Sequence, residues 1–249
     1  MIIHSFDIST PPMMTPESFY GPQKHICDIC LCTFSHIIFS EVVQTYSCEK
    51  IATIGSANGG KDVYAFMLDG KKVAIHLMGI GATVAATDAI ELNWLTGATK
   101  FIMFGSAGNL NRPATEGKYV IPTEAYRDEG MSYHYAPPAD YIAIANAERL
   151  AHIFEDISAP YVMGRVWTTD AFYRETRLQV AQRQSEGCLA VEMELAGVQA
   201  VCDFHHFDLY CFLAVGDVLD DIEYDVAKLP SANHDFDKFY LALEIAKRV

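Results

Sequence analysis

The amino-acid sequence predicts an α/β domain whose strands are buried in the core. Of the 249 residues, 51% are hydrophobic and 20% are charged, a balance typical of globular proteins and not of disordered ones. Two continuous apolar runs, Phe101–Phe104 and Leu209–Val215, have the composition of strands covered on both faces. Stretches with helical spacing alternate with such runs. A chain of this length can bury a large core, so we expect residues 1–249 to form a single domain.

The net charge, the lengths of the apolar runs and the cysteine count argue against several classes of protein. A net charge of −14 argues against broad contact with nucleic acid or anionic lipid, since both require a basic surface. No apolar run reaches the roughly 18 residues that a membrane helix needs. The seven cysteines are odd in number and no secretory leader pattern is present, so we expect a cytoplasmic protein.

Three of the cysteines, Cys27, Cys30 and Cys32, lie close together. A structural zinc site would need a second cysteine pair at matching spacing, and the sequence lacks one. We therefore interpret this segment as a buried strand and expect no metal.

The N-terminal segment differs in character from the rest. Residues 1–25 contain four prolines and few periodic apolar positions, which predicts an irregular arm packed on the domain or on a neighbouring subunit. After the cysteine-rich strand, Thr33, Phe34 and Ser35 place cap-type residues ahead of a helical run that includes Ile37. This strand-to-helix turn is a candidate anion site.

A hairpin and a glycine-rich turn come next. Val63–Leu68 and Val73–Met78 flank Asp69-Gly70, whose residues tolerate the positive φ angles of a two-residue turn. Gly79–Thr83 then opens a helix over about Val84–Leu95, which should end near Gly97. Backbone amides near Gly79 are therefore placed for close approach to a ligand.

The remaining elements follow the same alternation. Strands are expected at Phe101–Phe104, Lys118–Ile121, Tyr161–Trp167 and Leu209–Val215, and helices at Ala139–Phe154, Arg177–Arg183 and His234–Ala246. Tyr126–Pro138 is too long for a simple connector and is expected to carry function. Glycine or polar and aromatic residues follow four strands, and ligand sites of open α/β sheets lie at the carboxyl ends of strands. These segments should converge on one rim.

Two carboxylates flank Met193 where a helical pattern begins. Glu192 and Glu194 share a face in an extended segment but diverge by about 200° on a helix. Ionised carboxylates only accept hydrogen bonds, so the pair suits a vicinal diol. The alternative is a solvated first helical turn, where acidic residues favour the helix dipole.

Two further residues, Asp217 and Phe172, have side chains suited to proton donation and to stacking on a ring. Asp217 follows an apolar strand, and a carboxyl near such a core is suited to donate a proton near neutral pH. It could instead cap a turn with Val218, Leu219 and Asp220. Phe172 presents a flat face to a heterocycle, with core packing as its alternative.

In four blocks the sequence resembles the nucleoside phosphorylases and nucleosidases, which cleave N-glycosidic bonds. The resemblance extends from about Val73 to Asp221. It rests on the order and spacing of Met78–Gly81, Gly105–Gly108, Thr169–Tyr173, and Val191–Glu194 followed by Gly216-Asp217. It implies a three-layer α/β/α fold with a mixed central β-sheet.

The resemblance also implies roles for individual residues. Glu194 would grip the ribose hydroxyls with Met193 under the sugar and Glu192 in support, and Phe172 would stack on the base. Asp217 would protonate the leaving purine, with stabilisation of an oxocarbenium-like sugar as in glycoside hydrolysis. The other substrate-binding candidates are Ser106 and Gly105 near the nucleophile, Gly79, and Arg174.

The nucleophile end departs from the family pattern. Phosphorolytic members carry two phosphate-binding arginines, and the corresponding regions here read Thr33–Ile38 and Met103. Losing both would weaken phosphate binding about 10² to 10⁴-fold unless other groups replace them. Replacements would come from the amides after Thr33 or from Arg127, Arg165, Arg174 and Arg177; otherwise water is the nucleophile. The hydrolytic branch places a glutamate soon after the first strand, whereas Glu41 sits late.

We expect a pentosyltransferase of purine salvage that converts a purine nucleoside and phosphate to free base and (deoxy)ribose 1-phosphate. Inorganic phosphate is the co-substrate, and no other cofactor is expected. The alternatives are a hydrolytic nucleosidase, a uridine-type phosphorylase, which Asp217 disfavours, and a nucleoside-binding protein without catalysis. The resemblance implies a homo-oligomer, a dimer, trimer or hexamer, without fixing the number.

Overall fold

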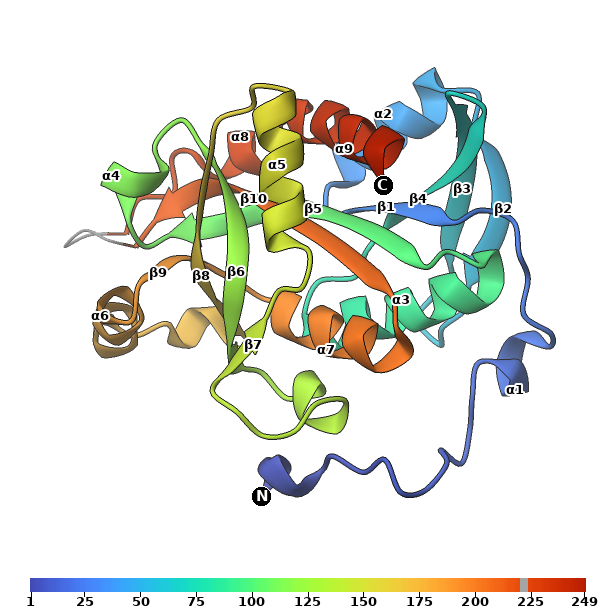
Figure 1. Ribbon diagram of the computed structural model, residues 1–249, viewed down its shortest axis with the longest axis horizontal. Helices are drawn as coiled ribbons and strands as arrows, with labels where there is room; N and C mark the ends of the chain where they lie inside the picture. Colours follow the sequence, from blue (N-terminus) through green and yellow to red (C-terminus); the bar gives the residue numbers. More distant parts are fainter. Residues whose placement is uncertain (220–223) are drawn as a thin grey trace.

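In the computed structural model, which describes residues 1–219 and 224–249, a mixed β-sheet runs through the molecule with helices on both sides (Figure 1). The strands among these residues are β1 (Ile29–Thr33), β2 (Glu49–Ile54), β3 (Lys61–Leu68), β4 (Lys71–Leu77), β5 (Lys100–Asn109), β6 (Tyr119–Asp128), β7 (Tyr141–Ala143), β8 (Tyr161–Thr169), β9 (Cys188–Glu192) and β10 (Asp208–Val218).

The sheet is partly closed into a barrel. Its strands follow the order β10-β6-β8-β9-β5-β1-β4-β3-β2, and β10 also pairs with β5. Strands β5, β10, β6, β8 and β9 therefore form a ring, from which β1, β4, β3 and β2 extend as an open wing. Parallel pairs such as β1 with β5 occur beside antiparallel pairs such as β3 with β4. The predicted mixed sheet is confirmed.

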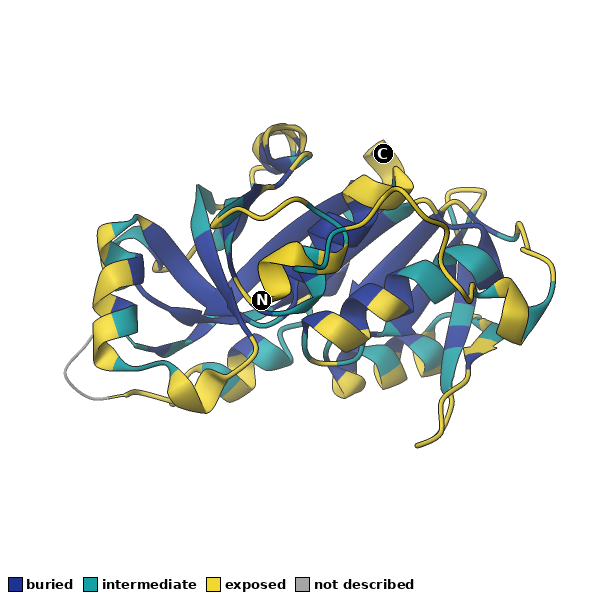
Figure 2. Cartoon of the chain, turned by 90° about the horizontal axis from the view of Figure 1, so that it is seen from below, coloured by how far each residue is buried: buried dark blue, intermediate teal, exposed yellow. Residues whose placement is uncertain are grey.

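Helices complete the other two layers. Helices α3 (Ala82–Thr96) and α7 (Leu195–His205) pack together on one face, and α2 (His36–Thr45), α5 (Ala147–Asp156) and α9 (Asp237–Arg248) lie on the other (Figure 1). The strands between them are largely buried, while the outer surfaces of the helices are exposed (Figure 2). Shorter helical segments are η1 (Ile2–His4), α1 (Glu17–Tyr20), α4 (Arg112–Thr115), η2 (Met131–His134), η3 (Phe172–Arg174), α6 (Arg177–Ser185) and α8 (Leu229–Asn233).

The turn chemistry expected from the sequence is present. Asp69 and Gly70 have φ angles of 49° and 82°, and together they join β3 to β4. The Ser35 hydroxyl accepts a hydrogen bond from the Ile38 amide and caps α2, and Gly97 ends α3 in the left-handed conformation. These local predictions are confirmed, because each depends on a residue with a strong conformational preference.

Residues 1–25 form an extended arm that contains only η1 and α1 (Figure 1). Two hydrogen bonds join the C-terminal part of this arm to α3. The Tyr20 hydroxyl donates to Glu91 at 3.1 Å, and the Trp94 indole donates to the Gly21 carbonyl at 2.7 Å.

The predicted strand ends are wrong at three places. Strand β5 continues through Gly105–Gly108, β6 continues through Pro122, and β10 continues through Gly216-Asp217. Barrel closure is the reason, since it supplies partners beyond the apolar runs: Gly105 pairs with Leu213, and Gly108 pairs with Val191. At Gly108 a Cβ would lie 2.6 Å from a Leu219 methyl carbon and 2.9 Å from a Val191 methyl carbon, so any side chain there would force these neighbours to shift.

The helix predicted at Ala139–Phe154 is correct only from Ala147 onward. Its first part is β7, which pairs with β6, and α5 begins only at Ala147. The predicted loop Tyr126–Pro138 likewise begins as the end of β6 and contains η2. Strand pairing outweighs the helical spacing of the apolar residues here.

Candidate functional site

A cavity of about 1310 Å³ opens at the edge of the barrel, beside the N-terminus of α2 and the segments η3, α6 and α8. It brings together seven of the residues predicted from sequence. These are Gly105, Ser106, Phe172, Glu192, Met193, Glu194 and Asp217. They come from β5, η3, β9, the β9–α7 junction and β10, so the expected convergence on one rim is found.

The two glutamates at the start of α7 have different surroundings. Glu192 ends β9, and its Oε2 accepts hydrogen bonds from the Glu194 and Leu195 amides, both at 2.7 Å. Its Oε1 accepts from the Thr168 hydroxyl. Glu192 therefore accepts from backbone amides at the start of α7, and both of its oxygens are bound to protein donors.

Glu194 is oriented from a different element. Its Oε1 accepts a hydrogen bond of 2.7 Å from the Gly81 amide, in the turn that opens α3. Glu194 is only 8% exposed, and it lines the cavity next to Met193. Burial raises the pKa of both glutamates, and the charge of Glu194 raises that of Glu192 further. The first helical turn is thus not solvated.

A second pair of carboxyls, those of Asp217 and Glu175, also lines the cavity. Asp217 is half-buried in β10, and its Oδ2 accepts a hydrogen bond of 2.9 Å from the Tyr224 hydroxyl. Glu175 also lines the cavity, and burial together with the nearby Asp217 charge raises its pKa to about 7. Glu175 can therefore hold a proton near neutral pH. Asp220, the last residue of the turn considered for Asp217, lies outside the described residues.

Aromatic rings lie at the rim. Phe172 is 49% exposed and so does not pack in the core. Its ring centroid lies 3.9 Å from that of Tyr173, which is 89% exposed. The two rings of η3 give the cavity an open aromatic wall that suits a flat heterocycle.

The opposite end of the cavity is built from hydroxyl groups and from residues near the C-terminus. Ser106 donates a hydrogen bond to the side-chain oxygen of Asn233. Ser35 Oγ lies 2.8 Å from Nδ1 of His234. Met103 and Phe34 add apolar surface beside these groups.

Lys238 supplies a positive charge at this end of the cavity. It is 1% exposed, and its ammonium donates to the carbonyls of Ala232 and Asn233, the latter at 3.4 Å. Burial lowers its pKa to about 8, which leaves it charged at neutral pH. Sequence reasoning missed Lys238, although a lysine on the apolar face of α9, in line with Ala242 and Ile245, was a usable signal.

Most of the other predicted residues lie outside the cavity wall. The Gly79 amide donates to Asp88 at 2.8 Å, whereas Ile80 faces the cavity. Arg174 is exposed in η3. Of the other candidate cations, Arg127 donates to Ser132 and Pro137, Arg165 pairs with Glu124, and Arg177 lines the cavity.

The structure also bears on metal binding and on membrane insertion. Within residues 1–219 and 224–249, no group of three or more His, Cys, Asp or Glu side chains is arranged to hold a metal ion. Cys27, Cys30 and Cys32 are buried in and next to β1. Over the same residues, no helix has both the length and the apolar character that a membrane span requires.

Comparison with known proteins relates this arrangement to one family. The model of the phosphorylase superfamily matches residues 39–243. The purine nucleoside phosphorylase DeoD-type of Exiguobacterium sibiricum is 28% identical over 156 residues, covering 60% of this chain and 65% of that relative. This chain therefore spans slightly less than two thirds of that relative.

Two other relatives are similar. The purine nucleoside phosphorylase DeoD-type of Streptococcus gordonii is 27% identical over 184 residues, covering 73% of this chain and 78% of the relative. The guanosine phosphorylase of Halorubrum lacusprofundi is 32% identical over 136 residues, covering 53% of this chain and 56% of the relative.

Proposed function

This chain belongs to the phosphorylase superfamily, and we propose that it cleaves the N-glycosidic bond of a purine nucleoside by phosphorolysis. The products would be the free base and (deoxy)ribose 1-phosphate. Relatives described as purine nucleoside and guanosine phosphorylases support the choice of a purine.

The observation that carries the proposal is the placement of Glu194 and Asp217 on the wall of one cavity. The Glu194 carboxylate accepts hydrogen bonds from the ribose hydroxyls, and the Met193 side chain lies beside the sugar. Phe172 covers the face of the base at the open aromatic wall. Asp217, within reach of the same space, protonates the leaving base.

This arrangement favours cleavage by charge separation. As the glycosidic bond lengthens, positive charge develops on the sugar, and the carboxylate of Glu194 stabilises it. Proton transfer from Asp217 neutralises the departing base. Glu175, whose pKa is raised to about 7, lines the same cavity and can supply a proton to Asp217 near neutral pH.

For the nucleophile, Lys238 is the group we assign in place of the family arginines. Its ammonium carries three donors, two of which reach the carbonyls of Ala232 and Asn233. The third has no acceptor among the described residues and is available to an anion. Ser35, Ser106 and His234 supply further polar contacts, and Arg177 adds a second cation to the wall.

Hydrolysis is the second candidate, and one observation favours it. Met103 and Phe34 fill the nucleophile end with apolar surface, so this end is less basic than a phosphate site with two arginines. Water held by Ser35 and His234 would then attack the sugar.

A panel of purine and pyrimidine nucleosides, each incubated with and without inorganic phosphate, tests the proposal. Release of purine bases that depends on phosphate supports it. Exclusive release of uracil, or no release from any nucleoside, contradicts it.

We also propose that the chain functions as a homo-oligomer. Ile80, on the cavity wall, is 68% exposed, and Tyr173 is 89% exposed. Exposed apolar surface at the mouth of a binding cavity is suited to cover by a second subunit. Light scattering of the purified protein would measure the subunit number, and a monomer at all concentrations would contradict this proposal.

A further inference from the structure

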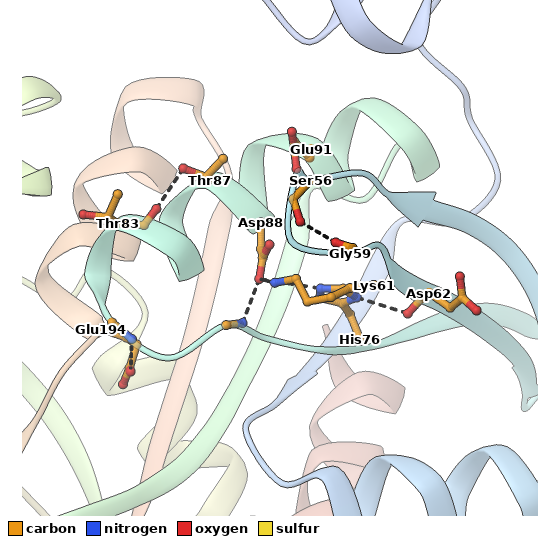
Figure 3. A network of polar contacts seen from close by, with 12 residues as sticks. Ser56, Gly59, Lys61, Asp62, His76, Thr83, Thr87, Asp88, Glu91 and Glu194 are labelled. Carbon is orange, nitrogen blue, oxygen red and sulfur yellow. Dashed lines mark hydrogen bonds and ion pairs between the residues drawn. The ribbon is translucent and has the colours of Figure 1, made fainter.

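A buried carboxylate, Asp88, lies beside the turn that holds Glu194 (Figure 3). It projects from the second turn of α3, and its side chain is 3% exposed. Asp88 does not line the cavity, and it belongs to none of the sequence blocks that suggested the family. A buried charge is costly unless it is paired, so the charge of Asp88 depends on the groups in contact with it.

One oxygen of Asp88 is in polar contact with three groups from different parts of the chain. Its Oδ2 accepts from the Lys61 ammonium on β3 and from the Gly79 amide at 2.8 Å, and it lies 3.6 Å from Nε2 of the fully buried His76 on β4. Burial acts to raise the pKa of Asp88, but these three contacts hold it below its usual value. Asp88 is therefore ionised and joins β3, β4 and α3 at one point.

The Gly79–Gly81 turn is fixed by this contact and by its own backbone. A Cβ at Gly79 would lie 2.2 Å from a Val84 methyl carbon and 3.2 Å from the Lys61 ammonium. Gly81 has a φ of 95°, which favours glycine. Two residues beyond the amide that Asp88 holds, the Gly81 amide donates to Glu194 at 2.7 Å.

We propose that Asp88 is a positioning residue that acts through the Gly79–Gly81 turn to orient Glu194 toward the hydroxyl groups of the sugar. Lys61 contributes by holding Asp88 in place. The proposal rests on the proposed function, because it assigns Glu194 to a sugar diol. Asp88 itself touches neither substrate nor nucleophile.

Binding of two ligands that differ only in hydroxyl groups separates positioning from general stability. Calorimetry in phosphate-free buffer would measure the Kd of inosine and of 2′,3′-dideoxyinosine. A misplaced Glu194 weakens the binding of inosine, because it loses its hydrogen bonds to the sugar hydroxyls. The binding of the dideoxy analogue is unaffected, because that ligand lacks these hydroxyl groups. The ratio of the two Kd values is therefore the readout, and the melting temperature of each variant is recorded beside it.

The expected result is that Asp88→Ala reduces the preference for inosine by at least about tenfold, the loss of one hydrogen bond to a charged group. Asp88→Asn should recover part of it, since an amide oxygen can still accept from Gly79. Lys61→Met should give an intermediate loss and keeps the test open if Asp88→Ala does not fold. Asp62→Asn is the control, because Asp62 neighbours Lys61 on β3 but forms an exposed pair with Lys50.

Two results would overturn the inference in distinguishable ways. A preference that is unchanged in all three variants, with only the melting temperature lowered, makes Asp88 purely structural while the proposed function stands. A wild-type protein that binds both ligands equally refutes the assignment of Glu194, and with it both proposals.

Discussion

The Oε1 atom of Glu194 accepts a hydrogen bond of 2.7 Å from the backbone amide of Gly81, which precedes it by 113 residues. This bond joins the start of α7 to the start of α3, the two helices that pack together on one face of the sheet. It holds the carboxylate at the cavity wall before any ligand arrives. Preorganisation of this kind reduces the entropy lost when a sugar binds.

Glu194→Gln should lower kcat/KM for a purine ribonucleoside about 10- to 100-fold, since hydrogen bonds to a charged group contribute roughly 1.5 to 3 kcal/mol. The amide keeps the size of the side chain but loses its charge. Steady-state kinetics measure the effect, with Glu155→Gln on the exposed surface of α5 as the control. A change of less than about twofold would be inconsistent with a ribose contact.

Asp217→Asn should slow the turnover of purine nucleosides by about 10² to 10⁴ and leave their Kd within a few-fold, because a general acid acts in the transition state and not in ground-state binding. Stopped-flow release of the base and calorimetry of binding measure the two quantities. Asp156→Asn, exposed at the end of α5, serves as the control. Unchanged turnover would remove Asp217 from the proton chemistry.

Lys238→Met should raise the KM for inorganic phosphate by about tenfold or more and change the nucleoside KM little, because the ammonium is assigned to the anion alone. Methionine fills the buried site without the cost of burying a charge, so the substitution should not lower the free energy of unfolding through loss of packing. Lys247→Met, at the exposed end of the same helix, is the matched control. Equal phosphate dependence in both variants would assign the anion to other groups.

The raised pKa of Glu175 makes stability depend on pH. The unfolded carboxyl titrates near 4.5 and the folded one near 7, so between these values the folded state holds a proton that the unfolded state has lost. The free energy of unfolding contributed by this group therefore falls as pH rises from 4.5 through 7. Glutamine mimics the protonated form at every pH.

Glu175→Gln should consequently match the melting temperature of the wild type at pH 4 and exceed it at pH 8. Thermal denaturation followed by circular dichroism at both pH values measures this difference. The same shift at both pH values, or a lower melting temperature at pH 8 alone, would show that Glu175 does not titrate as described.

Residues with a strong local preference could be predicted from the sequence. Asp69-Gly70, Ser35 and Gly97 each fix a turn or a helix end, and the structure has those elements in place. The resemblance to the nucleoside phosphorylases and nucleosidases also identified residues that share the cavity, among them Ser106, Glu194 and Asp217.

Features that depend on contacts distant in sequence could not be predicted. The pairing of β10 with β5 and β6 extends strands through glycines that, taken alone, indicate loops. Lys238 enters the cavity from the last helix, and Asp88 gathers groups from three elements. Neither residue lies in a motif, because its role depends on which elements the fold brings together.

Phosphorus NMR of the reaction mixture tests the central claim most directly. Purified protein would be incubated with a purine nucleoside and inorganic phosphate, and the products would be followed over time. Phosphorolysis predicts a sugar 1-phosphate signal that grows in step with free base and disappears in the Asp217→Asn variant. Free base accompanied by unphosphorylated sugar, or an unreacted nucleoside, would contradict the account.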